Sequence, residues 1–211
     1  MRKIYVLGLS PSPNLLTKEA LEVLQKAPVV FTYANDFPFN LDELLKGKKV
    51  VKLTPAFTDS SNRDEIIQRN IDLINSCKEE WGVFLEIGDS AVRNPLFYHI
   101  LGNKKIVEIE LIPGVSSVTA VLARLGLNVR HFCVVGSEEF DLIQKLVNIC
   151  DTFVILNIQP KNTKVFEFLK SNGYDITFVK NCCNPDEEIS KEYKGDTYWI
   201  IAVAILRKEK L

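Results

Sequence analysis

Three predicted strands of this chain each end in a loop whose residues could contact a ligand. The loops read "GLSPSPNLLT" (residues 8–17), "IGDSAVRNP" (residues 87–95) and "IPGVSS" (residues 112–117). In open α/β sheets, ligands bind beyond the carboxyl ends of the strands, so we expect the three loops to line one cleft. For each loop taken alone, the alternative is an ordinary tight turn.

The first loop argues against one common kind of ligand site. A phosphate cradle needs several glycines and free backbone N–H donors. Here Gly8 stands alone, and Pro11 and Pro13 have no N–H to offer. The sequence therefore disfavours a dinucleotide or P-loop nucleotide site, and the ligand need not carry a pyrophosphate.

The second loop places a glycine and a carboxylate directly after a hydrophobic strand. Backbone groups at such a strand end have no ladder partner and are available to a ligand. Asp89, which follows Gly88, has two interpretations: it binds a ribose, or it pins its own loop as an Asx turn.

The third loop separates a strand from a helix rich in small residues. Pro113 ends the strand, and Gly114 lets the backbone turn and approach closely. Ser116 or Ser117 is expected to cap the following helix, whose first turns read "VTAVLA". A thin helix entry of this kind leaves room for a flat or bulky group.

Composition limits the partners of the chain. Hydrophobic residues make up 46% and charged residues 25% of the 211 residues, which is typical of a globular protein. The net charge of −1 provides no global attraction to nucleic acid or to an anionic membrane, so an anionic ligand needs a local cluster of Arg or Lys. The apolar run at residues 199–206 is too short to span a membrane, and residues 1–9 begin a strand instead of a signal peptide. We therefore predict a cytoplasmic protein with no nucleic-acid or membrane partner.

Candidate metal ligands are few. His99 and His131 lie far apart in the sequence, and the five cysteines show no C-x-x-C spacing. Most cysteines are interpreted as small core residues, and we predict no metal site. The adjacent Cys182 and Cys183 are the one pair for which a soft-metal or redox site stays open as an alternative.

Strand-like and helix-like segments alternate along almost the whole chain, which predicts an α/β protein with substantially parallel pairing. The predicted strands span residues 3–9, 28–33, 48–54, 82–88, 107–112, 131–136, 152–157, 175–182 and 197–205. The predicted helices span residues 17–27, 40–47, 61–81, 94–101, 116–126, 140–149 and 163–173. We place a domain boundary at Pro113-Gly114, which gives two α/β domains, residues 1–113 and 114–211, each with a parallel or mixed sheet.

The three loops, in this order, resemble those of the tetrapyrrole methylases, S-adenosylmethionine-dependent enzymes that methylate corrin and porphyrin rings. The family pattern has a glycine-proline-glycine loop before "LLT" and "AL", a glycine-aspartate-proline loop, and a "PG-SS" segment before a small-residue helix. This chain has "GLSPSPNLLTKEAL", "IGDSAVRNPLFY" and "IPGVSSVTAVLARLGL". Ser10 and Ser12 stand where the family has glycines, and Ser90 stands where it has proline. The resemblance covers essentially the whole chain.

The second half narrows the resemblance. "DTFVILNIQPKNTKVFEFLKSNG" followed by "VKNCCNPDEEI" is similar to the branch that methylates C20 of precorrin-2 or cobalt-factor II. Three alternatives stay open: a sibling methylase for another ring position, a methylase acting on the modified histidine of an elongation factor (diphthine synthase-like) or on ribosomal RNA, and a non-catalytic cofactor-binding paralogue.

The resemblance also implies a site. S-adenosylmethionine would lie in a cleft between the two domains, and the family's members are commonly homodimers. The implied cofactor-binding residues are Pro11, Ile87, Gly88, Asp89, Val92, Ser116, Ser117 and Leu156. Arg93, followed by Arg124 and Arg130, would hold the carboxylates of the tetrapyrrole. Asp89, Tyr33 and His99 are the candidates for accepting the ring proton.

Overall fold

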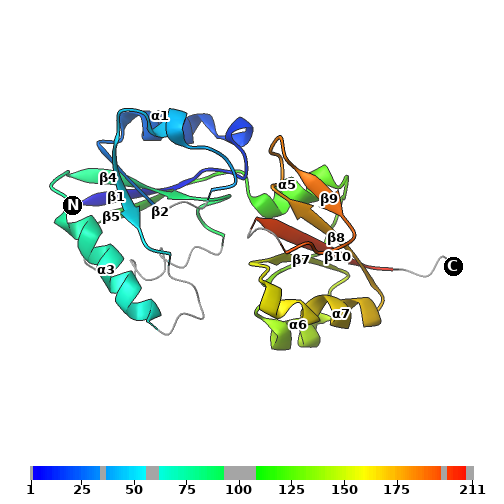
Figure 1. The fold of residues 1–211 in the computed structure, drawn as a ribbon. Coiled ribbons are helices and arrows are strands. Elements are labelled where there is room, and N and C mark those ends of the chain that lie inside the picture. The colour runs from blue at the N-terminus through cyan, green and yellow to red at the C-terminus, as the bar shows by residue number, and fades with distance from the viewer. Residues whose placement is uncertain (1, 34–36, 56–61, 93–107, 196–198, 208–211) are drawn as a thin grey trace. The chain divides into compact units, whose positions relative to one another are not determined.

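The computed structural model describes residues 2–33, 37–55, 62–92, 108–195 and 199–207. The chain divides into two compact units, Met1–Ser117 (unit 1) and Val118–Leu211 (unit 2) (Figure 1). Each unit is built on its own five-stranded sheet. The fold class expected from the alternating pattern is therefore confirmed, while the domain boundary at Pro113-Gly114 stays a prediction.

Unit 1 is a parallel sheet with helices on both faces (Figure 1). Its strands are β1 (Lys3–Gly8), β2 (Val29–Tyr33), β3 (Lys49–Leu53), β4 (Trp81–Glu86) and β5 (Glu108–Ile112), in the order β3-β2-β4-β1-β5. Its helices are α1 (Lys18–Lys26), α2 (Asp42–Leu45) and α3 (Arg63–Ser76). The inner strands β1, β2 and β4 are apolar on both faces because α1 and α3 pack on opposite sides of the sheet.

The register of unit 1 brings the three loops to one edge. Gly8 at the end of β1 pairs with Glu86 at the end of β4, and Leu7 pairs with Ile112 at the end of β5. Because all three strands are parallel and adjacent, their carboxyl ends coincide. Thr17 caps α1, as predicted, by accepting a hydrogen bond from the Ala20 N–H at 3.1 Å.

Unit 2 is a mixed sheet with one parallel pair, β6 and β7. Its strands are β6 (Cys133–Gly136), β7 (Thr152–Leu156), β8 (Tyr174–Lys180), β9 (Glu188–Ser190) and β10 (Ile200–Leu206), in the order β6-β7-β10-β8-β9. Its helices are α6 (Phe140–Leu146) and α7 (Lys164–Ser171), and α5 (Ser117–Arg124) begins at the last residue of unit 1.

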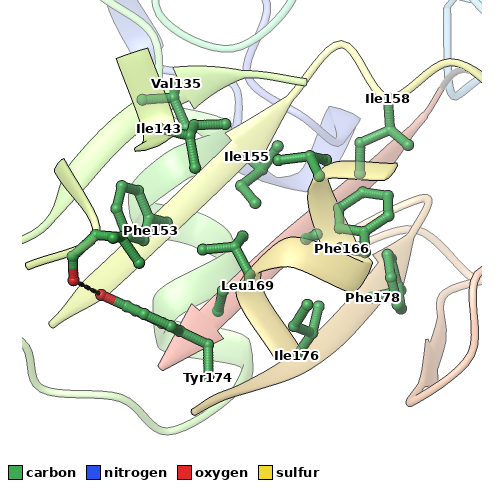
Figure 2. Close-up of a cluster of buried hydrophobic side chains, with 14 of the residues drawn as sticks. Val135, Ile143, Phe153, Ile155, Ile158, Phe166, Leu169, Tyr174, Ile176 and Phe178 are labelled. Carbon is green, nitrogen blue, oxygen red and sulfur yellow. Dashed lines mark hydrogen bonds between the residues drawn. The ribbon is translucent and has the colours of Figure 1, made fainter. Parts of the chain in front are cut away.

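The core of unit 2 lies between its sheet and the two helices α6 and α7. Figure 2 shows Leu169 and Phe166 of α7 facing Ile155, Ile176 and Phe178 of the strands. The hydroxyl of the buried Tyr174 donates to the carbonyl of Val147 at 2.7 Å, which satisfies the polar end of the ring.

Several predicted boundaries need correction. The helix predicted for residues 61–81 ends at Ser76, because Cys77 adopts an extended conformation with ψ of 135°. The strand predicted for residues 175–182 ends at Lys180, because Asn181 has a φ of 46° and starts a turn. The short strand β9 was not predicted. The helix predicted for residues 94–101 lies outside the described residues.

Cysteine pairing also differs from the sequence interpretation. Cys133 and Cys150 form a disulfide that links the start of β6 to the segment before β7. Cys77, Cys182 and Cys183 are free thiols. Within the described parts of the chain, every helix is too short or too polar to cross a membrane.

Candidate functional site

Three glycines hold the strand ends of β1, β4 and β5 in direct backbone contact. A Cβ placed on Gly8 would lie 2.6 Å from the nitrogen of Gly114 and 2.7 Å from the carbonyl oxygen of Gly88. A Cβ on Gly114 would meet the oxygen of Gly8 at 2.6 Å as well as the oxygen of Gly88. Real Cβ atoms do not approach other atoms this closely. The three loops expected to share a site therefore touch through their backbones.

Ser10 joins all three loops through hydrogen bonds. Its N–H donates to the carbonyl of Gly88 at 3.0 Å. Its buried hydroxyl donates to the carbonyl of Leu15 at 2.9 Å and accepts from the N–H of Val115 at 2.9 Å. Its φ of 62° lies in the left-handed region, where glycine is usual. A serine at this position keeps the backbone turn and adds two bonds that glycine lacks.

The other two serine departures also build the loops. Ser12 is buried and caps the short 3-10 helix Pro13–Leu15, accepting from the N–H of Asn14 at 3.4 Å. Ser90 is buried, and its hydroxyl donates to the carbonyl of Ile112 at 3.1 Å, which connects the second loop to the third. These serines are structural parts of the three-loop site and do not disrupt it.

Asp89 supports both its own loop and the third one. Its Oδ1 accepts from the N–H of Ala91 at 2.8 Å, which is the Asx turn considered from the sequence. Its Oδ2 accepts from the N–H of Gly114 at 3.2 Å. Each carboxylate oxygen has a second lone pair, so a ligand hydroxyl has an acceptor here without any change in the loop.

The third loop passes directly into helix α5 at Ser117. The nitrogen and Oγ of Ser117 lie 3.4 and 3.5 Å from where a Cβ of Gly88 would be. A side chain at position 88 would also be strained, because its φ is 76°. Thr17 ties the same loop to the start of α1, since its hydroxyl donates to the carbonyl of Pro113 at 3.2 Å. The entry to α5 is thus held beside the second loop.

Glu86 is a candidate site residue that the sequence interpretation missed. It is the last residue of β4, and its Oε2 is shielded from solvent without a hydrogen-bond partner among the described residues. Burial raises the pKa of its carboxyl to about 8. The sequence feature that could have indicated Glu86 is its position as an acidic residue near the end of the otherwise apolar run "GVFLEIG".

Tyr33 lies at the same edge of the sheet, at the end of β2. Its ring packs edge-on against Phe84, with 5.4 Å between ring centroids. Burial, and to a lesser extent the charge of Glu86, raise the pKa of its hydroxyl. Tyr33 is therefore neutral at physiological pH and suited to donate a hydrogen bond, whereas Glu86 can exchange a proton near neutrality.

The remaining predicted residues of unit 1 lie in the same loops. Pro11 is buried next to Ser10, and Ile87 is half-buried next to Gly88. Val92 is half-buried, and its N–H donates to the carbonyl of Asp89 at 3.1 Å. Ser116 precedes α5. Arg93 and His99 fall outside the described residues.

Two predicted site residues belong to unit 2. Leu156 ends β7, and its carbonyl accepts from the N–H of Ser137 at 2.9 Å. Arg124 forms a forked ion pair with Glu187, with Nη2 to Oε1 at 2.6 Å and Nε to Oε2 at 3.0 Å. Its guanidinium is therefore engaged within unit 2, which weakens its assignment to a substrate carboxylate.

Solved methyltransferases share this fold along nearly the whole chain. Uroporphyrin-III C-methyl transferase from Thermus thermophilus, complexed with S-adenosylhomocysteine, superposes with a TM-score of 0.71 at 19% identity, over 96% of this chain and 91% of that one. The cobalt precorrin-4 methyltransferase CbiF gives a TM-score of 0.69 at 22% identity, over 96% and 94% of the two chains. This chain therefore shares the fold of these proteins, with two α/β units.

Sequence comparison defines the family. The family profile of the tetrapyrrole (corrin/porphyrin) methylases matches residues 3–193, and the chain belongs to this family. A probable cobalt-precorrin-2 C(20)-methyltransferase of Methanocaldococcus jannaschii is 26% identical over 90% of this chain and 86% of its own length. A uroporphyrinogen-III C-methyltransferase of Cyanidium caldarium is 31% identical over 82% of this chain and 75% of its own length.

Proposed function

This chain is an S-adenosylmethionine-dependent methylase of the tetrapyrrole family, and we propose that it acts in cobalamin biosynthesis and that the carbon it methylates is C20 of precorrin-2 or cobalt-factor II. The Methanocaldococcus relative, which spans both units, supports the C20 assignment. Relatives that act elsewhere on the ring also match, including a probable cobalt-factor III C(17)-methyltransferase of Methanothermobacter thermautotrophicus, 29% identical over 64% of this chain and 37% of its own length. The fold itself does not select the substrate, since diphthine synthase superposes with a TM-score of 0.67 at 17% identity, over 98% of this chain and 90% of that one.

The observation that carries the proposal is the three-loop site of unit 1. Backbone contact of Gly8, Gly88 and Gly114 brings the three loops together at the carboxyl edge of the sheet, where α/β proteins bind ligands. Pro11, Ile87, Val92, Ser116 and Ser117 lie in these loops. S-adenosylmethionine has no phosphate, which agrees with a first loop that lacks phosphate-binding N–H groups. Leu156 stays a prediction for the same cofactor.

Asp89 is proposed both to hold the loops of the cofactor site in place and to bind the cofactor itself. Its two oxygens fix the second and third loops through the N–H groups of Ala91 and Gly114. The free lone pairs of the same oxygens would accept from a ribose hydroxyl. Loss of the carboxylate would thus remove a ligand contact and loosen the loops around it.

Methyl transfer requires no covalent intermediate with the protein. S-adenosylmethionine supplies an activated methyl group when bound, so the chain contributes orientation and removal of one ring proton. Glu86 is our candidate for accepting that proton, because it ends β4 at the sheet edge where the three loops meet and its pKa is raised to about 8. Tyr33, whose pKa is raised, would remain a hydrogen-bond donor.

Substrate carboxylates require cations, and Arg93 remains our first candidate for binding them. Arg124 is second, since binding a carboxylate would require it to leave Glu187. A homodimer located in the cytoplasm is proposed from the family resemblance, and size-exclusion chromatography with light scattering would test the dimer.

Transfer of radiolabel from methyl-labelled S-adenosylmethionine would test the function. The protein is incubated with metal-free precorrin-2 or with cobalt-factor II, and label is counted in the tetrapyrrole fraction. We expect transfer to one of the two. Binding of S-adenosylmethionine without transfer of label to either tetrapyrrole would instead favour a non-catalytic paralogue. If the protein bound neither S-adenosylmethionine nor a tetrapyrrole, the proposal would be refuted.

A further inference from the structure

The turn between β8 and β9 gathers three potential metal ligands. Its backbone doubles back on itself, with the N–H of Asn184 donating to the carbonyl of Asn181 at 3.0 Å and the N–H of Glu187 donating to the carbonyl of Asn184 at 3.0 Å. The turn places the carboxylate of Glu187 beside the adjacent Cys182 and Cys183. The sequence alone shows only two neighbouring cysteines, so the third ligand emerges from the fold.

The spacing of these ligand atoms suits a tetrahedral ion. The Sγ atoms of Cys182 and Cys183 are 3.6 Å apart. All three ligand atoms, including an oxygen of Glu187, lie within 4.8 Å of one another. In tetrahedral zinc sites the Zn–S distance is about 2.3 Å, which separates two sulfur ligands by roughly 3.8 Å. The two sulfurs therefore already stand at the separation that such an ion requires.

The charges around the cluster act in both directions. Two thiolates would balance the charge of a divalent ion. Arg124 forms a forked ion pair with Glu187 and so places a positive charge beside the carboxylate, which opposes binding of a cation. The backbone N–H of Cys183 donates to Oε2 of Glu187 at 2.6 Å, which orients the carboxylate toward the cysteines.

We propose that Cys182, Cys183 and Glu187 bind a thiophilic divalent cation of the Zn²⁺ class in unit 2, with water as the fourth ligand. All three residues are buried or half-buried, so the ion would be partly shielded from solvent. Binding deprotonates both thiols and releases the protons to solvent. Because Arg124 already donates to both oxygens of Glu187, the ion would have to displace one of these hydrogen bonds. The proposal revises our sequence prediction of no metal site, and it does not depend on the methyltransferase function.

Cobalt is the spectroscopic probe for this site. The full-length, metal-free protein, with its free thiols reduced, is titrated with Co²⁺ under anaerobic conditions, and Zn²⁺ is added afterwards. We expect a thiolate-to-cobalt charge-transfer band and the visible bands of tetrahedral cobalt, all of which Zn²⁺ abolishes by displacement. Absence of the charge-transfer band from the wild-type protein would overturn the proposal, whatever the variants do.

Four variants assign the ligands. Cys182→Ser and Cys183→Ser should each remove most of the charge-transfer intensity, and Glu187→Gln should weaken cobalt affinity about tenfold or more. Arg124→Gln should tighten binding, because it frees the carboxylate and removes a positive charge; a purely structural cluster would not show this gain. Cys77→Ser, which alters the free thiol of unit 1, is the matched control and should leave the spectrum unchanged. A band that survives Cys182→Ser but disappears in Cys77→Ser would refute the assignment.

Discussion

Replacement of Gly114 by alanine tests the backbone contact on which the three-loop site depends. The new Cβ would lie 2.6 Å from the oxygen and 2.7 Å from the carbonyl carbon of Gly8, and it would also overlap the oxygen of Gly88. All of these atoms are backbone, so no side-chain rotation relieves the overlap. Gly114 does not have a positive φ, and the cost of the substitution is therefore steric.

The expected magnitude follows from the crowding. Overpacking of a tight site costs about 1–3 kcal/mol in free energy of unfolding, and overlap with the backbone of both Gly8 and Gly88 places Gly114→Ala at about 3 kcal/mol. Gly47→Ala is the matched control in unit 1, because Gly47 has a φ of +74° and no neighbouring atom within 4 Å. Gly47→Ala should lower the free energy of unfolding only through backbone strain, by about 1 kcal/mol. The two variants should differ by about 2 kcal/mol, which corresponds to a shift of about 1 M in the urea midpoint.

Tryptophan fluorescence provides the assay. Trp81 lies on β4 and packs edge-on against Tyr5 at 5.4 Å, so its emission reports on unit 1. Trp199, the other of the two tryptophans, is replaced by phenylalanine in all samples. Calorimetry with S-adenosylhomocysteine is run in parallel and should show weaker binding for Gly114→Ala only. Equal urea midpoints for the two variants would refute the packing argument.

Three further predictions concern Asp89, Glu86 and the disulfide. Asp89→Ala should lower the stability of unit 1 by about 2 kcal/mol, because two N–H groups lose their acceptor, and it should weaken calorimetric binding of S-adenosylmethionine at least tenfold; unchanged affinity would contradict the site. Glu86 has a folded-state pKa of about 8 against 4.5 ordinarily, so wild-type stability should fall as pH rises from about 4.5 to 8, by at most about 5 kcal/mol. Glu86→Gln should match the wild type in urea unfolding at pH 4 and be more stable at pH 8, and parallel pH profiles would argue against burial of this carboxyl. Cys133→Ser should lower the stability of unit 2 by about 3 kcal/mol, because the disulfide joins residues 17 positions apart, and a reductant should remove the difference from the wild type. In this experiment Trp199 is kept as the reporter of unit 2, and Trp81 is replaced by phenylalanine instead.

Much of the fold could be predicted from the sequence, because strands and helix starts are marked by short runs of neighbouring residues. Strand runs such as residues 82–88 are apolar on both faces. This pattern is typical of a strand in a sheet that is covered on both sides. Thr17 before an amphipathic run correctly marked the start of α1. The parallel pairing of β1, β4 and β5 was expected from the alternation of strands and helices, whereas the adjacency of these three strands, which brings the loops together, comes from the fold.

The parts that sequence missed depend on contacts between distant residues. Ser10 and Ser90 looked like departures from a family pattern, yet their hydroxyls bind Val115 and Ile112, about a hundred and about twenty positions away. Arg124 looked free for a substrate until the fold placed Glu187 against it. Burial of Glu86 depends in the same way on the neighbours that cover the end of β4.

The most direct test of the central claim is to map S-adenosylhomocysteine onto the backbone by amide chemical shifts. The ¹⁵N-labelled, deuterated protein is assigned and titrated with the ligand. The largest shifts should occur at the N–H groups of Ser10, Gly88, Asp89, Gly114 and Ser117, which form the three-loop site. Saturable shifts confined to other parts of the chain, or no shifts at all, would contradict the account.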